Sequence, residues 1–448
     1  MRISHYRWRI PNPILLGRDG WLRIVPVKIP NEARKTHLYT IGRSGYGKSK
    51  FLQHLITQDI LAGRGVCVID PHYDLIRDVM LDLLDAGHFK DQNNFNKVVY
   101  FEPTRTDYTI PFNYLNIDRP SHKHADIIIE VFKRAWPKNL EGAPRFKDIG
   151  KPSLRVLKET GQTLVDWREF LRNRGYRDQL LNRLQKTNPE LVHSFRKDFD
   201  TAMSKDKEFL MNSESVANKL TDFEYDPDVK RCLGHAESRI NFKDFMDKSK
   251  VLFVNLNGCS PEIKPLFASL ISMGFEMAAF ERGEGRTPFY LYLDEFQSYC
   301  ANEGSSETLA NVLSQCRKYG LRLHLANQTL GQLSQTVIDA LENVGIKVAF
   351  STGVSDGKQL AYHFWIPDKE RIEVTLKAGR LHRSMHQKAL VKLDGWELIE
   401  MYTERMKKPK ATLEELEALK LALLQKHGVK VLGTGERPIL VGGEQVYF

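Results

Sequence analysis

Along this chain the spacing of apolar residues changes between two periods, and the changes mark its domain organisation. Between residues 35 and 140, short apolar runs at 66–69 and 98–101 flank a helical pattern at 75–84, which predicts alternating strands and helices. Such alternation is typical of an α/β domain with a parallel-rich central sheet. The preceding segment, residues 1–34, alternates apolar and polar residues from position 14 to 29 and predicts an N-terminal β-hairpin.

The strand pattern disappears over residues 141–235, where only helical patterns remain. We therefore expect an inserted all-helical domain, with helices at residues 164–174, 177–184 and 191–202. Residues 236–405 show strand patterns again, which predicts the second part of the same α/β domain. Its strands are expected at residues 251–256, 288–293, 321–327 and 348–351.

The last segment, residues 406–448, is expected to hold a linker and a helix. Thr412 and Glu415 have the spacing of a capping box at the start of this helix. One helical face is expected to carry the apolar residues Leu413, Leu416, Leu419, Leu423 and Leu424. The helix could pack against its own domain or dock on a neighbouring subunit.

A glycine-rich segment follows a strand expected at residues 37–41 and precedes a helical pattern, in the strand-loop-helix context of the phosphate-binding pattern G-x-x-x-x-G-K-[ST]. Glycines let backbone N–H groups face phosphates, Lys48 supplies a positive charge, and the Ser49 hydroxyl can ligate Mg²⁺. We therefore predict that the chain binds ATP and Mg²⁺. The expected binding residues are Gly42, Arg43, Ser44, Gly45, Tyr46, Gly47, Lys48 and Ser49.

The strand expected at residues 288–293 ends in Asp294 and Glu295. Asp294 suits the acid that holds Mg²⁺ in a P-loop NTPase, and Glu295 is placed to polarise a water molecule on the γ-phosphate. A kinase needs no such water, so the pair favours hydrolysis over phosphoryl transfer. Taken without the phosphate loop, the same two residues fit a strand that ends in a solvated loop.

Two further polar residues border the strand expected at residues 321–327. Gln328 follows it, and an amide there could hydrogen-bond the γ-phosphate or the attacking water. Arg317 precedes it, in a helix end that Gly320 closes. By residue type alone, Arg317 fits a cation that complements the helix dipole.

Five motifs follow one another in order along the chain. They are the phosphate loop, Val68-Ile69-Asp70-Pro71-His72 with Asp74-Leu75, Asp294-Glu295-Phe296, Arg317-Lys318-Tyr319-Gly320, and Ala326-Asn327-Gln328 with Gln332-Leu333. Together they resemble the HerA/FtsK superfamily of hexameric DNA-pumping ATPases, and more narrowly the TraG/TraD-like type IV coupling proteins and their soluble relatives. The resemblance extends over nearly the whole chain.

The resemblance implies a RecA-like P-loop motor domain, assembly as a ring, expected to be a hexamer, and ATP-driven movement of DNA. It implies the catalytic residues Lys48, Glu295, Gln328 and Arg317 and the Mg²⁺ ligands Ser49 and Asp294. In this interpretation Gln328 senses the γ-phosphate, and Arg317 acts as an arginine finger on the nucleotide of a neighbouring subunit.

The chain departs from the family pattern in two places. Tyr73 stands where relatives usually have glycine, so the loop after the second strand is expected to differ in shape. Coupling proteins typically begin with transmembrane helices, whereas the most apolar stretch here, residues 266–280, is interrupted by polar residues and is shorter than a span requires. We therefore expect no intrinsic membrane span.

Charge and cysteine content fit a cytoplasmic protein that binds a polyanion. The net charge is +10 and the pI is about 9.1, which suit DNA but also a merely basic protein. Six basic residues cluster in the helical insertion and could face DNA or only solvent: Arg168, Arg172, Arg174, Arg177, Arg183 and Lys186. The five cysteines show no zinc spacing, and their odd number favours a reducing compartment.

These observations lead to an expected function and its alternatives. We expect an ATP-hydrolysing, ring-forming DNA translocase that acts in conjugative transfer or mobile-element processing, with a relaxase, a nuclease or a secretion channel as a possible partner. One alternative is a viral or mobile-element genome-packaging ATPase. Another is a nucleotide-dependent switch that recruits DNA or a relaxase without processive movement, and a third is a protein-secretion ATPase.

Overall fold

The computed structural model describes most of the chain and divides it into two compact units. The described residues are 13–19, 25–136, 146–197, most of 211–221, 225–299, 312–313, 315–363, 388–395, 398–404, 406–431, 438–441 and 444–447. Unit 1 comprises Met1–Tyr100, Phe242–Asn257 and Gly274–Lys420, and unit 2 comprises Phe101–Asn241, Gly258–Met273 and Leu421–Phe448.

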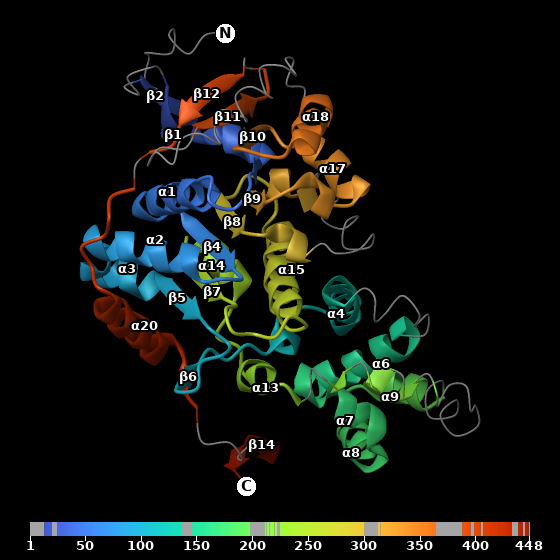
Figure 1. The fold of residues 1–448 in the computed structure, drawn as a ribbon. Helices are drawn as coiled ribbons and strands as arrows, with labels where there is room; N and C mark the ends of the chain where they lie inside the picture. The colour runs from blue at the N-terminus through green and yellow to red at the C-terminus, as the bar shows by residue number, and fades with distance from the viewer. Residues whose placement is uncertain are drawn as a thin grey trace. The chain divides into compact units, whose positions relative to one another are not determined.

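Unit 1 is built on an eleven-stranded sheet, in the order β2-β1-β12-β11-β10-β3-β9-β8-β4-β7-β5 (Figure 1). In chain order the strands are β1 Pro13–Asp19, β2 Val25–Pro30, β3 Leu38–Ile41, β4 Gly65–Asp70, β5 Val98–Phe101, β7 Val251–Asn255, β8 Phe289–Leu293, β9 Leu321–Asn327, β10 Ile346–Ala349, β11 Lys388–Leu393 and β12 Ile399–Tyr402.

The middle of this sheet is parallel. Strands β10, β3, β9, β8, β4 and β7 pair in that order with parallel register, and every residue of these strands is buried. Burial on both faces explains the largely apolar runs of β4, β7 and β8. Strands β9 and β10 also include the buried polar residues Arg322, His324 and Lys347. The predicted α/β class, with one sheet assembled from two separated stretches of chain, is therefore confirmed.

One side of the sheet is antiparallel. Strands β1 and β2 form the predicted hairpin, and β1, β12, β11 and β10 continue the sheet in antiparallel pairs. The sequence did not predict β11 or β12. The four residues of β12 are too few to show an alternation clearly, and β11 follows the undescribed residues 364–387 rather than a recognisable helix.

Helices connect these strands. In unit 1 they are η2 Asn31–Thr36, α1 Lys48–Leu61, α2 Asp74–Asp85, η3 His88–Lys90, α3 Gln92–Lys97, α14 Phe242–Asp247, η7 Phe296–Tyr299, η8 Cys316–Tyr319, η9 Leu330–Gln332, α17 Gln335–Glu342 and α18 Val354–His363. Two further helices, α15 Lys264–Arg282 and α20 Leu413–His427, have residues in both units.

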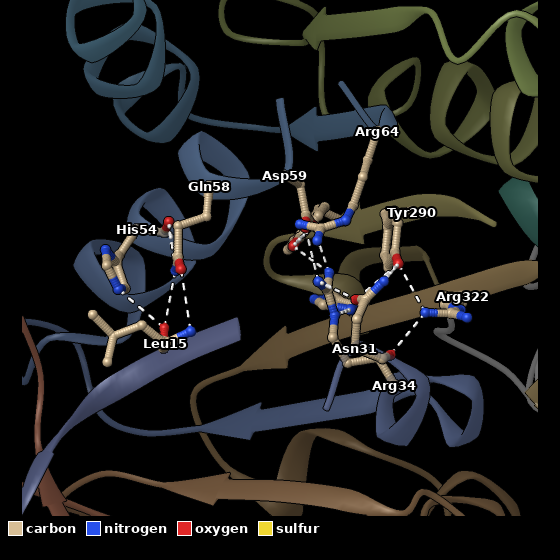
Figure 2. A network of polar contacts seen from close by, with 11 residues as sticks. Leu15, Asn31, Arg34, His54, Gln58, Asp59, Arg64, Tyr290 and Arg322 are labelled. Atoms are coloured by element: carbon tan, nitrogen blue, oxygen red, sulfur yellow. Dashed lines mark hydrogen bonds and ion pairs between the residues drawn. The ribbon is translucent and has the colours of Figure 1, made fainter. Parts of the chain in front are cut away.

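Helix α1, which begins in the phosphate loop, is fastened to the N-terminal hairpin (Figure 2). Gln58 accepts a hydrogen bond from the Leu15 N–H at 3.1 Å and donates to the Leu15 carbonyl at 2.9 Å. Nε2 of His54 lies 3.1 Å from the same carbonyl. The hairpin therefore holds the middle of α1 through the backbone of a single residue.

A buried ion pair fastens α1 to the sheet (Figure 2). Arg34 of η2 donates to both carboxylate oxygens of Asp59 at 2.8 and 2.5 Å, and neither side chain is exposed. The Tyr292 hydroxyl on β8 donates to Asp59 at 2.6 Å, and Arg64 reaches it at 3.0 Å. Because α1 starts at Lys48 and β8 ends beside Asp294, this pair helps to fix the two halves of the candidate site relative to each other.

Unit 2 is mainly helical. Its helices include α4 Ser121–Ala135, α6 Phe146–Glu159, η5 Leu164–Asp166, α7 Trp167–Arg172, α8 Arg174–Leu184, α9 Pro189–Phe195 and α13 Pro227–Leu233. The helix predicted at 164–174 is divided into η5 and α7 and ends at Asn173, whose side chain caps α8 by accepting from the Tyr176 N–H. Asn188 caps α9 in the same way, with Pro189 at the first helical position.

The cluster of six basic residues in the insertion is not a single surface. Arg177 is 4% exposed and donates to the carbonyls of Phe170 and Leu171 at the end of α7. It therefore satisfies orphan carbonyls of a helix terminus, which corrects its place among the candidate DNA contacts. Arg172, Arg174, Arg183 and Lys186 are exposed.

The C-terminal helix α20 begins with the predicted capping box, in which Thr412 and Glu415 exchange hydrogen bonds of 2.8 and 3.1 Å. The chain just before it donates two backbone N–H groups to Asp85 at the end of α2. This agrees with packing against the same chain. Leu413, expected on the apolar face, is 66% exposed, because the buried stripe begins one turn later and includes Lys420 instead.

Candidate nucleotide-binding site

The phosphate loop lies between β3 and α1, as predicted. Gly45 and Gly47 have φ of 83° and 100°, a region that disfavours residues with a Cβ. Gly42 packs so closely that an added Cβ would lie 2.6 Å from Cβ of Phe350. No side chain caps the N-terminus of α1, so the N–H groups of its first turn are available to an anion.

Lys48 of the loop meets both acidic residues that follow β8. Its Nζ lies 2.6 Å from Oε1 of Glu295 and 3.5 Å from Oδ1 of Asp294, and all three side chains are largely buried. The structure therefore brings the loop lysine and the predicted acidic pair into one site. A phosphate bound in the loop would compete with Glu295 for the same ammonium group.

Glu295 is also held by two amides. Gln328, directly after β9, donates from Nε2 to Oε1 of Glu295 at 3.1 Å. Gln297 donates from Nε2 to Oε2 at 2.6 Å. The backbone of Glu295 has φ of 50°, a region that costs a residue with a side chain about 1–2 kcal/mol. Such a conformation persists where the surrounding contacts fix it.

The environment shifts the pKa values of Asp294 and Glu295 in opposite directions. Burial raises the pKa of Asp294 to about 6; the Lys48 ammonium opposes this shift, and the charges of Asp70 and Glu295 add to it. Burial also raises the pKa of Glu295, but the Lys48 ammonium and three donated hydrogen bonds outweigh it, so this pKa lies below its ordinary value. Glu295 is thus the more readily ionised of the two, as a group that polarises water must be.

The loop after β4 borders the same sheet edge. Asp70 accepts from the N–H groups of His72 and Ile76 at 2.8 and 3.1 Å, which ties the loop to the start of α2. Tyr73, expected to alter this loop, has φ of 74°, the conformation for which glycine is favoured. Nζ of Lys420 lies 4.9 Å from the centre of the Tyr73 ring and 5.1 Å from that of Tyr100.

The residues at this edge fit a magnesium ion in their chemistry. Oxygen donors are the ligands Mg²⁺ takes, and it commonly uses one or two protein groups together with phosphates and water. Within the described ranges no three His, Cys, Asp or Glu side chains gather as a metal site. The pKa of Asp294 is raised mainly by burial and further by the charges of Asp70 and Glu295, and a bound cation would favour its ionised form. Ser49, the other predicted ligand, is exposed on the first turn of α1.

Arg317 lies away from its own phosphate loop. It is an exposed residue of η8, which precedes β9, whereas Gln328 follows β9. The seven residues of β9 separate the two by roughly 20 Å. Arg317 is therefore not brought together with Lys48, Asp294 and Glu295, and any phosphate it contacts must belong to another molecule.

Two residues of this site received no role from the sequence. Gln297 was not identified, although it lies two positions after Glu295 and a polar residue in that loop could have been considered. Asn327 ends β9 and accepts a hydrogen bond from the Tyr39 hydroxyl at 2.7 Å, and its carbonyl accepts from the Gly42 N–H at 3.3 Å. Asn327 thus connects the strand before Gln328 to the start of the phosphate loop.

Comparison with known proteins agrees with this geometry. Residues 158–343 match the family described as type IV secretory system conjugative DNA transfer. The matched region includes Asp294, Glu295, Arg317 and Gln328. A search of curated proteins found no match.

Solved structures with the same fold include the bacterial conjugative coupling protein TrwB in an unbound form, with 17% identity, a TM-score of 0.58 and coverage of 87% of this chain and 90% of that one. TrwB in complex with ADP and Mg²⁺ shows 16% identity, a TM-score of 0.55 and coverage of 86% and 89%. VirB4 of Thermoanaerobacter pseudethanolicus shows 16% identity, a TM-score of 0.56 and coverage of 88% and 96%. At these identities the likeness establishes the fold.

Among the helices in the described ranges, none combines the length and apolarity needed to cross a bilayer. The phosphate loop, the acidic pair at the end of β8 and the amide after β9 occur in the order and at the sheet edge that the sequence predicted. The family match over residues 158–343 and the shared fold both agree with the resemblance to the type IV coupling proteins of the HerA/FtsK superfamily.

Proposed function

We propose that this chain is an ATP-hydrolysing motor that assembles as a ring, expected to be a hexamer, and moves DNA during conjugative transfer or mobile-element processing. The observation that carries the proposal is the contact between Lys48 of the phosphate loop and Glu295 at the end of β8, with Gln328 on the same carboxylate. A passive nucleotide-binding module needs the loop but has no need for a buried carboxylate directed at the loop lysine.

In the proposed mechanism, different residues of the site bind phosphate, hold Mg²⁺ and activate water. The loop N–H groups and Lys48 bind the β- and γ-phosphates, and Ser49 and Asp294 would hold Mg²⁺, which when bound neutralises charge on the phosphate oxygens. Once Lys48 contacts phosphate, Glu295 loses its closest positive partner and can accept a proton from the attacking water. Gln328, whose amide already contacts Glu295, is placed to respond to the same γ-phosphate.

Proteins of this fold supply the cofactor assignment. TrwB has been solved with ADP and Mg²⁺ and with a non-hydrolysable ATP analogue. We assign Mg²⁺-ATP to this chain on the basis of that likeness and of its own phosphate loop. DNA is assigned from the family match, with which the net charge of +10 agrees.

The first prediction tests turnover and substrate together. Wild-type protein should hydrolyse ATP at a rate that DNA raises severalfold, with single- and double-stranded DNA compared, and the stimulation should fall as salt rises because bound phosphates release counterions.

Lys48→Ala should abolish hydrolysis and weaken nucleotide binding. Glu295→Gln should keep bound ATP but stop turnover, because the phosphate cradle stays intact and Lys48 is no longer held by a charged carboxylate.

Lys50→Ala is the matched control, since Lys50 is an exposed lysine two residues from Lys48 that pairs with Asp78. It should hydrolyse ATP like wild type. Hydrolysis without any response to DNA would favour a protein-secretion ATPase, and nucleotide binding without steady hydrolysis would favour a switch. Near-wild-type turnover by Glu295→Gln would exclude Glu295 as the base.

A further inference from the structure

The carboxylate of Glu295 has a partner to which none of the motifs assigns a role. Oε1 of Glu295 is occupied by Lys48 at 2.6 Å and Gln328 at 3.1 Å, whereas Oε2 accepts only from Nε2 of Gln297, at 2.6 Å, among the contacts of the described residues. Because each oxygen is held from a different element, both the position and the plane of the carboxylate are fixed.

The short segment that carries Gln297 is itself well defined. Asp294 accepts a hydrogen bond from the Glu295 N–H at 3.1 Å, and the Ser298 N–H donates to the Glu295 carbonyl at 3.0 Å. These bonds surround the left-handed backbone of Glu295, at φ of 50°. Gln297 therefore reaches Glu295 from a turn whose conformation is set by Glu295 itself.

Within the described residues, the other end of the Gln297 amide has no hydrogen-bond donor. Its Oε1 is buried and accepts no hydrogen bond from the residues that the structure describes. A buried acceptor of this kind is unusual unless a water or a ligand supplies the donor. One end of the amide thus fixes Glu295, and the other end can accept a hydrogen bond from water.

We propose that Gln297 is a positioning residue for ATP hydrolysis, and this rests on the function proposed above for Glu295. When phosphate takes Lys48, Oε1 of Glu295 loses its closest contact, but the bond from Gln297 to Oε2 does not involve the nucleotide and remains. Gln297 keeps the carboxylate aligned after Lys48 has left. Its free acceptor is available to the water that Glu295 polarises.

The test compares Gln297→Met, which keeps the length and removes the amide, with Gln297→His, which retains an N–H donor. A hydrogen bond to a charged group is worth enough for kcat to fall about tenfold to hundredfold in Gln297→Met. KM for ATP and nucleotide affinity should change less than about threefold, because the cradle is intact. Gln297→His should recover part of the lost kcat.

Gln335→Met is a matched control. Gln335 also donates to a carboxylate at 2.6 Å, that of Asp339, but both residues are exposed on α17. This variant should retain the wild-type kcat. Melting temperatures of all variants are measured alongside, so that loss of folded protein is separated from loss of turnover.

A double-mutant cycle completes the test. Glu295→Gln should stop steady turnover and leave only a trace of hydrolysis that long single-turnover reactions can measure. Adding Gln297→Met should lower that trace rate no further, since the two act through one carboxylate. A kcat for Gln297→Met within twofold of wild type, or an equal loss in the Glu295→Gln background, would overturn the proposal. Absence of hydrolysis by the wild type, or normal turnover by Glu295→Gln alone, would instead reject the function on which it rests.

Discussion

At the scale of single residues, the site is organised around the charge of Lys48. This one ammonium contacts both Asp294 and Glu295, and it is the main reason that the pKa of Glu295 lies below its ordinary value despite burial. In the proposed mechanism, nucleotide binding attracts Lys48 and thereby releases Glu295. We therefore expect this one side chain to couple substrate binding to activation of the base.

In the proposed mechanism, Arg317 would act on the nucleotide of a neighbouring subunit. It is exposed, and β9 separates it from the end of the sheet where its own phosphate loop lies. An arginine finger is worth about 10³–10⁵ in rate, and a guanidinium offers two parallel donors to phosphate oxygens. Arg317→Ala should therefore bind ATP almost normally and lose most hydrolysis. Mixing it with Lys48→Ala subunits should restore some activity, measured as ATP turnover.

Lys318→Ala is the control for this experiment, because Lys318 is the adjacent exposed cation in the same 3₁₀ helix. It should keep most activity and should not need complementation. Mixed rings that contain both variants, as verified by native mass measurement, and still show no recovery would return Arg317 to a role at the end of its helix.

The residues assigned to the nucleotide site could be placed together from the sequence because their chemistry has fixed spacing, and their catalytic roles stay predictions. The loop pattern requires Lys48 and Ser49 at set positions, and strands that end in Asp294 and Gln328 meet at one edge because they are parallel. Gln297 was not predictable in this way. Its role depends on a turn with φ of 50° at Glu295, and no pattern of residue types specifies that conformation.

At the scale of elements, the position of α1 depends on Asp59. Arg34, Tyr292 and Arg64 all direct donors at its carboxylate inside the protein. Removing the charge leaves Arg34 buried without its counter-ion, and breaking a buried pair costs about 3–5 kcal/mol. Asp59→Asn should therefore lower the free energy of unfolding by an amount in this range, measured by denaturant titration.

A matched partly exposed ion pair provides the comparison. Arg18 and Glu404 lie 2.7 Å apart, with side-chain exposures of 42% and 19%. Glu404→Gln makes the same chemical change as Asp59→Asn, and solvent screening should limit its cost to about 1 kcal/mol or less. Equal costs for the two variants would mean that burial of the Arg34 pair does not matter to stability.

Some elements followed from the sequence and others did not. The strands at β4, β5, β7 and β8 were predicted within one residue or so because they are largely apolar runs in a sheet covered on both faces. Strand β9 was predicted as well, although Arg322 and His324 interrupt its apolar residues. The break at Asn173 was missed because the apolar spacing continues through it, while its amide caps the next helix. Capping chemistry thus overrode the periodicity.

At the scale of the whole molecule, lowering the pH should reduce the stability of the folded chain through its buried histidines. Burial lowers the pKa of His37 to about 4, with help from Arg317 and Arg322, while its ring binds the Leu313 carbonyl and accepts from the Leu323 N–H. In the unfolded chain its pKa is near 6.5. Between pH 6.5 and 4 the unfolded chain binds more protons, so stability should fall as the pH is lowered, by up to about 3 kcal/mol.

His37→Gln tests this assignment, because glutamine also offers one donor and one acceptor but does not titrate. Denaturation midpoints measured from pH 7 to 4.5 should show a shallower decline for the variant than for wild type, whatever its stability at pH 7. Parallel curves would assign the acid sensitivity to other groups, among them His124 of unit 2, whose pKa burial lowers to about 2.

Tyr73 and Lys420 carry a consequence for how the sequence can vary. Tyr73 holds a backbone conformation suited to glycine, and Lys420 of α20 lies over its ring. The left-handed backbone at Tyr73 is unfavourable for a residue with a side chain, and the contact between its ring and Lys420 offsets part of that cost. The residues at positions 73 and 420 therefore depend on each other. Among descendants of this chain, Tyr73 and Lys420 should be inherited together or lost together, and a glycine at position 73 should free position 420 to vary.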